Sequence, residues 1–96
     1  MLESAYQAKL IKILENLFPS CVIMKNDAGY RQGFPDLLIL FNDRWACLEV
    51  KNDEAASLQP NQEHWIDRLR AMSFAGFIYP QNEREVLDAL REFFGA

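Results

Sequence analysis

Apolar residues recur along the 96-residue chain with two spacings, which predict where helices and strands lie. Over residues 2–18 the apolar positions follow the period of a helix with one buried face, and Pro19 ends that segment. The same period returns after Pro60, a residue suited to the first turn of a helix because its missing N–H costs nothing there. It appears again over residues 86–94. Three amphipathic helices are therefore expected, and the apolar stripe of the second consists of Trp65, Ile66, Leu69 and Met72.

Four short apolar runs predict strands. They cover residues 21–24, 37–41, 45–50 and 76–79. The polar pair Asn42-Asp43 separates the two middle runs and is typical of a two-residue hairpin turn. The last run ends at Pro80, which favours a position at the edge of the sheet. Residues 26–33 contain two glycines and are expected to form a loop.

The order of the predicted elements indicates an α/β fold. A tight hairpin joins the second and third strands antiparallel, whereas the helix that follows suits a crossover to a parallel fourth strand. The hairpin is apolar on both faces, so the sheet is expected to be covered on both faces. We therefore expect a single domain over residues 1–96, in which helices flank a four-stranded mixed β-sheet in the order αβββαβα.

Two carboxylates and a lysine lie at the ends of the hairpin strands. If the turn has two residues, Asp36 stands opposite Glu49, about 5 Å away between Cβ atoms. Strand side chains alternate, so Lys51 points the same way as Glu49 while Val50 points to the other face. The three charged groups are thus expected to converge. A three-residue loop would instead shift the pairing by one and move Asp36 to the other face.

Opposed like charges destabilise a sheet unless a further group compensates them, and a divalent cation would do so. Mg²⁺ prefers oxygen ligands, commonly one or two carboxylates completed by water and substrate phosphate. Asp36, Glu49 and the Val50 carbonyl are the expected ligands, and Lys51 would assist an attacking water or neutralise charge on the phosphate. The pattern favours a magnesium-dependent phosphodiesterase. In a purely structural interpretation, Asp36 is a turn residue and Glu49 and Lys51 are solvent-facing strand charges.

Four other residues are candidates for the same site. Gln62 precedes two apolar helix positions by three and four residues, so its amide is expected to point inward to the carboxylates; the alternative is a helix cap. Glu3 lies at the margin of a buried helix face and is a candidate third acid, or an acid favoured by the helix dipole. Lys25 and Arg31 flank the loop along which a phosphate backbone would pass, or are ordinary loop charges.

Net charge, chain length and cysteine content restrict the possible classes of function further. The net charge of −4 argues against a simple nucleic-acid-binding module but does not exclude a nuclease, whose acids hold a cation. The core is small, so dimerisation would be a natural supplement. No apolar run is long enough to span a bilayer and the N-terminus lacks signal-peptide features, so a cytoplasmic protein is expected. Cys21 and Cys47 are expected to be reduced core residues, although a disulfide between neighbouring strands remains open.

Pro35-Asp36 followed by Glu49-Val50-Lys51, on two strands after an N-terminal helix, resembles the PD-(D/E)XK nuclease superfamily. A wider set of motifs resembles the VRR-NUC (virus-type replication-repair nuclease) domain over residues 3–79. The set comprises Lys25-Asn26, Gly29, Arg31, Gly33-Phe34-Pro35-Asp36-Leu37-Leu38, Leu48-Glu49-Val50-Lys51 and Leu58-Gln59-Pro60-Asn61-Gln62. The sequence departs from many relatives in lacking a serine directly before Pro60, which affects only local helix capping.

The resemblance implies a restriction-endonuclease-like core and a Mg²⁺- or Mn²⁺-dependent endonuclease acting on branched, Holliday-junction-like DNA. It makes Asp36 and Glu49 metal ligands, Lys51 the catalytic lysine, Gln62 the helix glutamine and Glu3 the acid of the first helix. Short members resemble phage-encoded proteins, which would place the protein in the host cytoplasm, and they are homodimers. The alternative is a non-catalytic nucleic-acid-binding or assembly module with the same fold, which would have no need for closely opposed acids.

Overall fold

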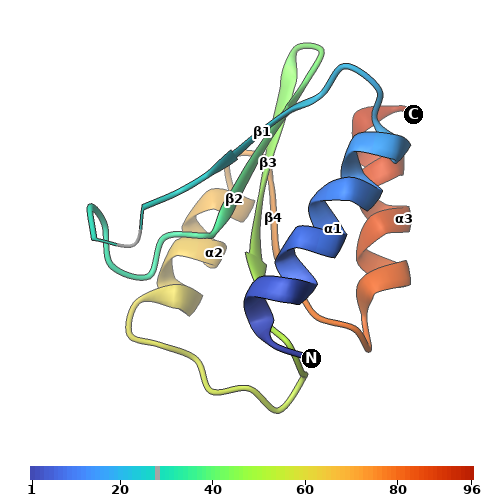
Figure 1. The fold of residues 1–96 in the computed structure, drawn as a ribbon. Helices are drawn as coiled ribbons and strands as arrows, with labels where there is room; N and C mark the ends of the chain where they lie inside the picture. The colour runs from blue at the N-terminus through green and yellow to red at the C-terminus, as the bar shows by residue number, and fades with distance from the viewer. Residues whose placement is uncertain (28) are drawn as a thin grey trace.

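The computed structural model describes residues 1–27 and 29–96, so position 28 of the predicted loop lies outside the described residues. Within these residues the chain forms three helices and four strands (Figure 1). They are α1 (Glu3–Leu17), β1 (Val22–Lys25), β2 (Leu37–Phe41), β3 (Arg44–Val50), α2 (Gln62–Arg70), β4 (Phe74–Ile78) and α3 (Glu83–Phe94). The predicted order αβββαβα is confirmed. The predicted bounds of the second strand are those of β2, and the bounds of the other three differ from those observed by one or two residues.

The strands form one four-stranded sheet in the order β1-β2-β3-β4. β1 pairs antiparallel with β2, and β2 pairs antiparallel with β3. β3 pairs parallel with β4 because α2 forms the crossover between them. The expected mixed sheet of a restriction-endonuclease-like α/β fold is thereby confirmed, as is the edge position of the strand that ends before Pro80.

The β2–β3 hairpin has the register that the sequence predicts. Phe41 pairs with Arg44 and Leu37 pairs with Leu48, so the turn contains two residues. Asn42 has a φ of 55°, in the left-handed region that asparagine tolerates better than most residues. This turn excludes a one-residue slip, and it therefore determines which face of the sheet each side chain of β3 occupies.

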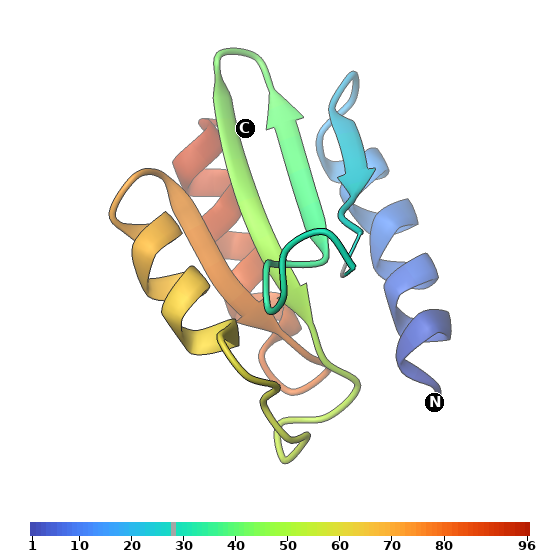
Figure 2. The same cartoon turned by 90° about the vertical axis from the view of Figure 1, so that its left-hand side faces the viewer.

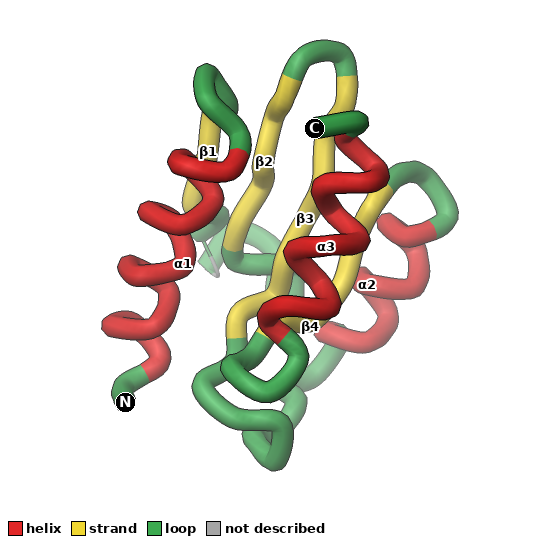
Figure 3. Tube along the Cα trace, turned by 90° about the vertical axis from the view of Figure 1, so that its right-hand side faces the viewer, coloured by secondary structure: helices red, strands yellow, loops and turns green. Residues whose placement is uncertain are grey.

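α1 and α3 cover one face of the sheet, and the main core lies between them and the strands (Figure 3). Three aromatic rings meet in this core: Phe18 lies 5.1 Å from Phe94 and 5.5 Å from Phe41 between ring centroids. The fully buried aliphatic residues around them include Leu10, Leu14, Ile39, Leu48, Ile78 and Leu90. This core includes residues of both hairpin strands, so the hairpin is anchored on α1 and α3.

α2 packs on the opposite face of the sheet (Figure 2), where Ile66 and Leu69 are buried with Cys47 and Ala75. The expectation that Met72 belongs to this stripe is wrong. Its side chain is 61% exposed because α2 ends at Arg70 and Met72 lies in the turn that leads to β4.

The predicted start of the second helix at Pro60 also needs correction. Asn61 has a φ of 72°, which is left-handed and not compatible with a helical turn, so α2 begins at Gln62. Pro60 precedes the helix in a turn instead of occupying its first position. The carbonyl of Asn61 still accepts from the Trp65 N–H at 3.0 Å, which makes Asn61 the residue that flanks the helix.

The expectation that both faces of the sheet are covered is wrong for β1 and for part of β2. α2 lies mainly against β3 and β4, and Leu38 of β2 packs against its cluster, but Val22, Met24 and Leu40 on the same face are 53%, 52% and 38% exposed. Cys21 and Cys47 are free thiols, as expected. None of the helices in the described ranges is long and apolar enough to cross a membrane.

Candidate active site

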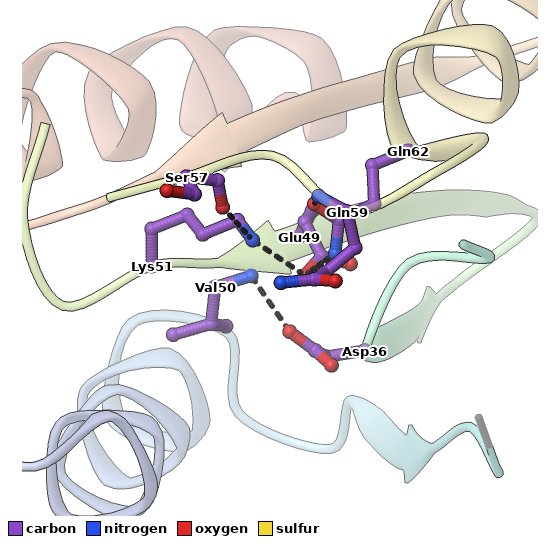
Figure 4. A network of polar contacts seen from close by, with 7 residues as sticks. All are labelled: Asp36, Glu49, Val50, Lys51, Ser57, Gln59 and Gln62. Carbon is purple, nitrogen blue, oxygen red and sulfur yellow. Dashed lines mark hydrogen bonds and ion pairs between the residues drawn. The ribbon is translucent and has the colours of Figure 1, made fainter. Parts of the chain in front are cut away.

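The predicted acid pair lies where the two hairpin strands end. Asp36 directly precedes β2, and its Oδ2 accepts a hydrogen bond from the Val50 N–H at 2.9 Å (Figure 4). Asn26 fastens the same segment to β1, since its backbone N–H donates to the Asp36 carbonyl at 2.8 Å and its Nδ2 donates to the Pro35 carbonyl at 2.7 Å. Asp36 is therefore held between β1 and β3, in the position that the hairpin register predicts.

Glu49 occupies the penultimate position of β3 and is only 3% exposed. Its Oε2 accepts from Gln62 Nε2 at 3.0 Å and lies 4.0 Å from Lys51 Nζ. Its Oε1 is buried and has no hydrogen-bond partner among the described residues. A buried carboxylate oxygen without a donor is costly when the group is ionised, so this atom favours either a proton shared with Asp36 or a cation.

The surroundings of Glu49 raise its pKa to about 8. Burial is the largest cause, because it penalises the charged form, and the neighbouring negative charge of Asp36 is the next. Lys51 opposes the shift, whereas the charge of Glu3 adds a small contribution to it. A side-chain hydrogen bond with Asp36 raises the pKa of Glu49 further, so the two carboxyl groups lie within reach of each other. Two carboxylates that resist joint ionisation are poised for a cation.

Lys51 points toward Glu49, as the alternation along β3 predicts. The residue is 6% exposed, and its Nζ donates to the Ser57 carbonyl at 3.2 Å. Its backbone N–H donates to the Ile78 carbonyl at 2.9 Å, which joins the end of β3 to β4. Lys51 is therefore held at both ends, with its ammonium group beside the carboxylate.

The prediction that Gln62 points inward to the carboxylates is confirmed. Gln62 is 8% exposed, and its Nε2 donates a hydrogen bond to Glu49. Its Oε1 accepts from the Gln59 backbone N–H at 2.8 Å, just before the helix. This amide therefore tethers the turn before α2 and contacts Glu49, but it does not cap the helix, whose N-terminus has no side-chain cap hydrogen bond in the part of the chain that the structure describes.

Glu3 is the first residue of α1 and is exposed. No group of three or more histidine, cysteine or acidic residues suited to a metal occurs in the described parts of the chain. The charge of Glu3 acts on Glu49, and its role as a third acid stays a prediction. Lys25 is exposed at the end of β1, and exposed Arg31 has its guanidinium carbon 5.2 Å from the centroid of the Trp65 ring. The DNA contacts expected of Lys25 and Arg31 stay a prediction.

Two features of the site were not anticipated from the sequence. One is the Asn26 tether to Asp36. The other is Gly33, which has a φ of 81°, and a Cβ there would lie 2.5 Å from the Pro60 carbonyl oxygen. The loop before Asp36 thus touches the turn before α2. A glycine just before Phe34-Pro35 is a signal for unusual backbone, but the sequence does not reveal the segment that it touches.

The donor set suits one hard cation better than a closed metal cage. Asp36 and Glu49 supply carboxylate oxygens, and Glu49 Oε1 is the buried oxygen without a partner. Two protein carboxylates with remaining positions open are common for Mg²⁺, which retains water and binds substrate phosphate. The residues present therefore fit a divalent metal, with Asp36, Glu49 and the Val50 carbonyl as the candidate ligands.

The family model for the VRR-NUC domain matches residues 2–78 of the chain. Comparisons with curated proteins and with solved structures each found no significant match. The matched range contains the first helix, all four strands and α2, and thus every candidate site residue described above. The VRR-NUC domain is a nuclease domain, and domains of this kind generally use divalent metals. The chain belongs to the VRR-NUC domain family.

Proposed function

We propose that the protein is a metal-dependent DNA endonuclease that hydrolyses phosphodiester bonds in branched DNA. The observation that carries this proposal is the buried Glu49 carboxylate, which lies beside Asp36 and Lys51 and retains one oxygen without a partner. A binding module would have no use for such a costly arrangement. A phosphodiesterase needs a cation, a positioned water and a positive charge near the phosphate, and this arrangement suits all three.

Asp36, Glu49 and the Val50 carbonyl would hold the metal, which we propose to be Mg²⁺ or Mn²⁺. When bound, such an ion lowers the pKa of a coordinated water and polarises a phosphodiester. The protein's own contribution is orientation. The Val50 N–H positions Asp36 through its Oδ2, and Gln62 occupies Oε2 of Glu49, so that Oε1 stays available.

Lys51 would act on the substrate. The Ser57 carbonyl and Glu49 hold its ammonium group in a buried position, where its charge is little screened by water. From there it would orient the attacking water or offset the negative charge that develops on the phosphate. Glu3 would contribute through its charge, which acts on Glu49 from the first turn of α1.

The preference for branched DNA and the homodimer belong to the same proposal. In a chain with a net charge of −4, binding of phosphate has to come from local basic groups, and Lys25 and Arg31 lie on the segments next to Asp36. A dimer would present two active sites to a branched molecule. It would also give the exposed apolar side chains of β1 and β2 a partner.

The test is a cleavage assay on four-way, flap, duplex and single-stranded DNA with Mg²⁺ or EDTA. We expect cleavage in Mg²⁺, none in EDTA, and none from Lys51→Met, which keeps much of the buried side-chain volume. Lys9→Met, at an exposed position of α1, is the matched control and should cleave normally. Light scattering of the same samples tests the dimer.

A wild-type protein that binds branched DNA but cuts none of these substrates in Mg²⁺ or Mn²⁺ would support the non-catalytic binding module instead. Near-normal cleavage by folded Lys51→Met would remove the role given to Lys51. Circular dichroism of each variant separates loss of activity from loss of fold.

A further inference from the structure

A cluster of aromatic and arginine side chains lies on the loop before β2 and on α2, the two segments that supply Asp36 and Gln62. Figure 2 shows this loop next to the start of α2. The members of this aromatic–arginine cluster are Tyr30, Arg31, Phe34, Trp65 and Arg68. We propose that the cluster binds an unpaired DNA strand beside the scissile phosphate. This inference rests on the proposed nuclease function and names the feature of branched DNA that the site selects.

The geometry of the cluster centres on Trp65. The Phe34 ring meets it edge-on, with ring centroids 5.3 Å apart and an interplanar angle of 63°. The guanidinium carbons of Arg31 and Arg68 lie 5.2 Å and 5.5 Å from the centroid of the Trp65 ring. Arg31 also lies 5.9 Å from the Tyr30 ring centroid. Both guanidinium groups are therefore held against rings by cation–π contacts.

The charges of these two arginines are available for a ligand. Neither Arg31 nor Arg68 forms an ion pair within the described residues. A guanidinium that stacks on a ring keeps its in-plane N–H donors free, and that planar fork matches a phosphate. On a chain with a net charge of −4, two oriented guanidinium groups without ion-pair partners in the described ranges, on the segments that supply Asp36 and Gln62, suit the backbone of a nucleic acid strand.

Tyr30 gives the cluster its preference for unpaired bases. The residue is 83% exposed, far more than packing of the loop onto α2 requires. Exposed aromatic rings next to basic groups are the usual platform on which single-stranded bases stack. A base inside a duplex already stacks on its neighbours and has no free face to offer. Tyr30 is thus suited to a strand that has left the duplex, as at a fork, flap or junction.

A surface hollow beside the ring has the size and chemistry for a base. Its volume is about 310 Å³, at the low end of the range for small-ligand pockets. It is lined by Lys25, Asn26, Asp27, Tyr30, Arg31 and Phe34. Asp27 would repel a phosphate but accept a hydrogen bond from a base. The hollow therefore suits a base, while Arg31 in its wall and Arg68 outside it suit the backbone.

The test is binding of labelled oligonucleotides to the full chain in EDTA, where a metal-dependent nuclease does not cut. Fluorescence anisotropy would compare a forked DNA, a single strand and a blunt duplex of one sequence. We expect the wild type to prefer the fork and the single strand. Tyr30→Ala should weaken those two roughly 5- to 100-fold, the range for loss of one base stack, and leave the blunt duplex unchanged.

Matched variants separate the ring from the charges. Tyr30→Phe keeps the ring and should bind as the wild type does. Arg31→Gln and Arg68→Gln should weaken binding to all three DNAs and reduce its dependence on salt. Arg84→Gln, at an exposed position of α3, changes the net charge equally and should have little effect.

Two results with folded Tyr30→Ala would overturn the inference: a fork affinity equal to that of the wild type, or an equal loss of affinity for fork and duplex. A wild type that binds none of the DNAs, or one that prefers the duplex, would overturn it as well. Cleavage in Mg²⁺ then separates the two proposals. A protein that holds forked DNA through Tyr30 but cuts nothing is not a nuclease and retains the strand-binding cluster. If the protein cuts DNA and Tyr30→Ala keeps the same preference for forked over duplex DNA, the protein is a nuclease, but the aromatic–arginine cluster does not bind the unpaired strand.

Discussion

Gln62 Nε2 donates a hydrogen bond to Glu49 Oε2 at 3.0 Å and so connects the first residue of α2 to the end of β3. The orientation of the amide follows from its other contact, because Gln62 Oε1 accepts from the backbone N–H of Gln59. With Oε2 occupied, Glu49 Oε1 is the oxygen left without a partner. Gln62 thus acts on the proposed metal through a carboxylate that it holds in one orientation.

Gln62→Ala should therefore lower the affinity for the metal more than it lowers the stability of the fold. Loss of the amide frees the Glu49 carboxylate to rotate, and loss of such supporting contacts typically costs about 10- to 100-fold in metal affinity or activity. We expect the Mg²⁺ concentration for half-maximal cleavage to rise by about that factor. Gln59→Ala is the control, because its side chain is exposed and its backbone N–H is unchanged. An unchanged Mg²⁺ requirement in Gln62→Ala would contradict the supporting role.

Asp36→Asn should separate activity from stability. The amide oxygen of asparagine can still accept from the Val50 N–H, so the local bond is kept while the negative charge beside Glu49 is lost. Cleavage should disappear, whereas at pH 9, where Glu49 is ionised, the metal-free protein should become more stable by about 0.5–1 kcal/mol. Urea unfolding in EDTA measures the second effect. Asp43→Asn, in the exposed hairpin turn, should alter neither activity nor stability, and a less stable Asp36→Asn protein would argue against repulsion between the acids.

The parts of the site that the sequence predicts depend on local chain geometry. The Asn42-Asp43 turn determines the hairpin register, and the alternation along β3 then places Lys51 beside Glu49. The inward direction of Gln62 follows in the same way from helical spacing. In each case the spacing of residues close in sequence carries the information, so no knowledge of distant contacts is needed.

The parts that the sequence missed depend on segments that meet only in the folded chain. α2 stops at Arg70, so Met72 lies in solvent, although its spacing suits the buried stripe. The left-handed Asn61 delays the start of the same helix. The contact between Gly33 and the turn before α2 joins segments that lie far apart in the sequence. The spacing of apolar residues does not show where tertiary contacts end a helix or delay its start.

Buried Glu49 should make the metal-free protein less stable as the pH rises. Burial, followed by the charge of Asp36, raises its folded-state pKa from 4.5 to about 8. Below pH 4.5 both the folded and the unfolded chain hold the proton, so Glu49 does not make the free energy of unfolding depend on pH. Between pH 4.5 and pH 8 only the folded chain keeps the proton, so the free energy of unfolding falls as the pH rises. The total fall is on the order of a few kcal/mol, and the free energy of unfolding levels off above pH 8.

Urea unfolding in EDTA from pH 5 to pH 9 measures this dependence, and the comparison with Glu49→Gln isolates it. The variant lacks the titrating group, so its stability should exceed that of the wild type at pH 9 and approach it at pH 5. Glu63→Gln, at an exposed position of α2, should follow the wild type at every pH. A constant difference between wild type and Glu49→Gln across the range would mean that Glu49 is not buried as a neutral acid.

Gly33→Ala should damage both stability and cleavage, although Gly33 contacts no ligand. A Cβ at this position would lie 2.5 Å from the Pro60 carbonyl oxygen, and the φ of 81° is costly for alanine. We expect a loss of about 1–3 kcal/mol in the free energy of unfolding, because the loop must leave the turn before α2. That movement would also displace Asp36, which follows three residues later, so cleavage should fall further than the unfolded fraction explains. Gly76→Ala is the control, since its added Cβ would meet no atom within 4 Å. If Gly33→Ala and Gly76→Ala both had small and equal effects, the close contact at Gly33 would not be needed to position Asp36.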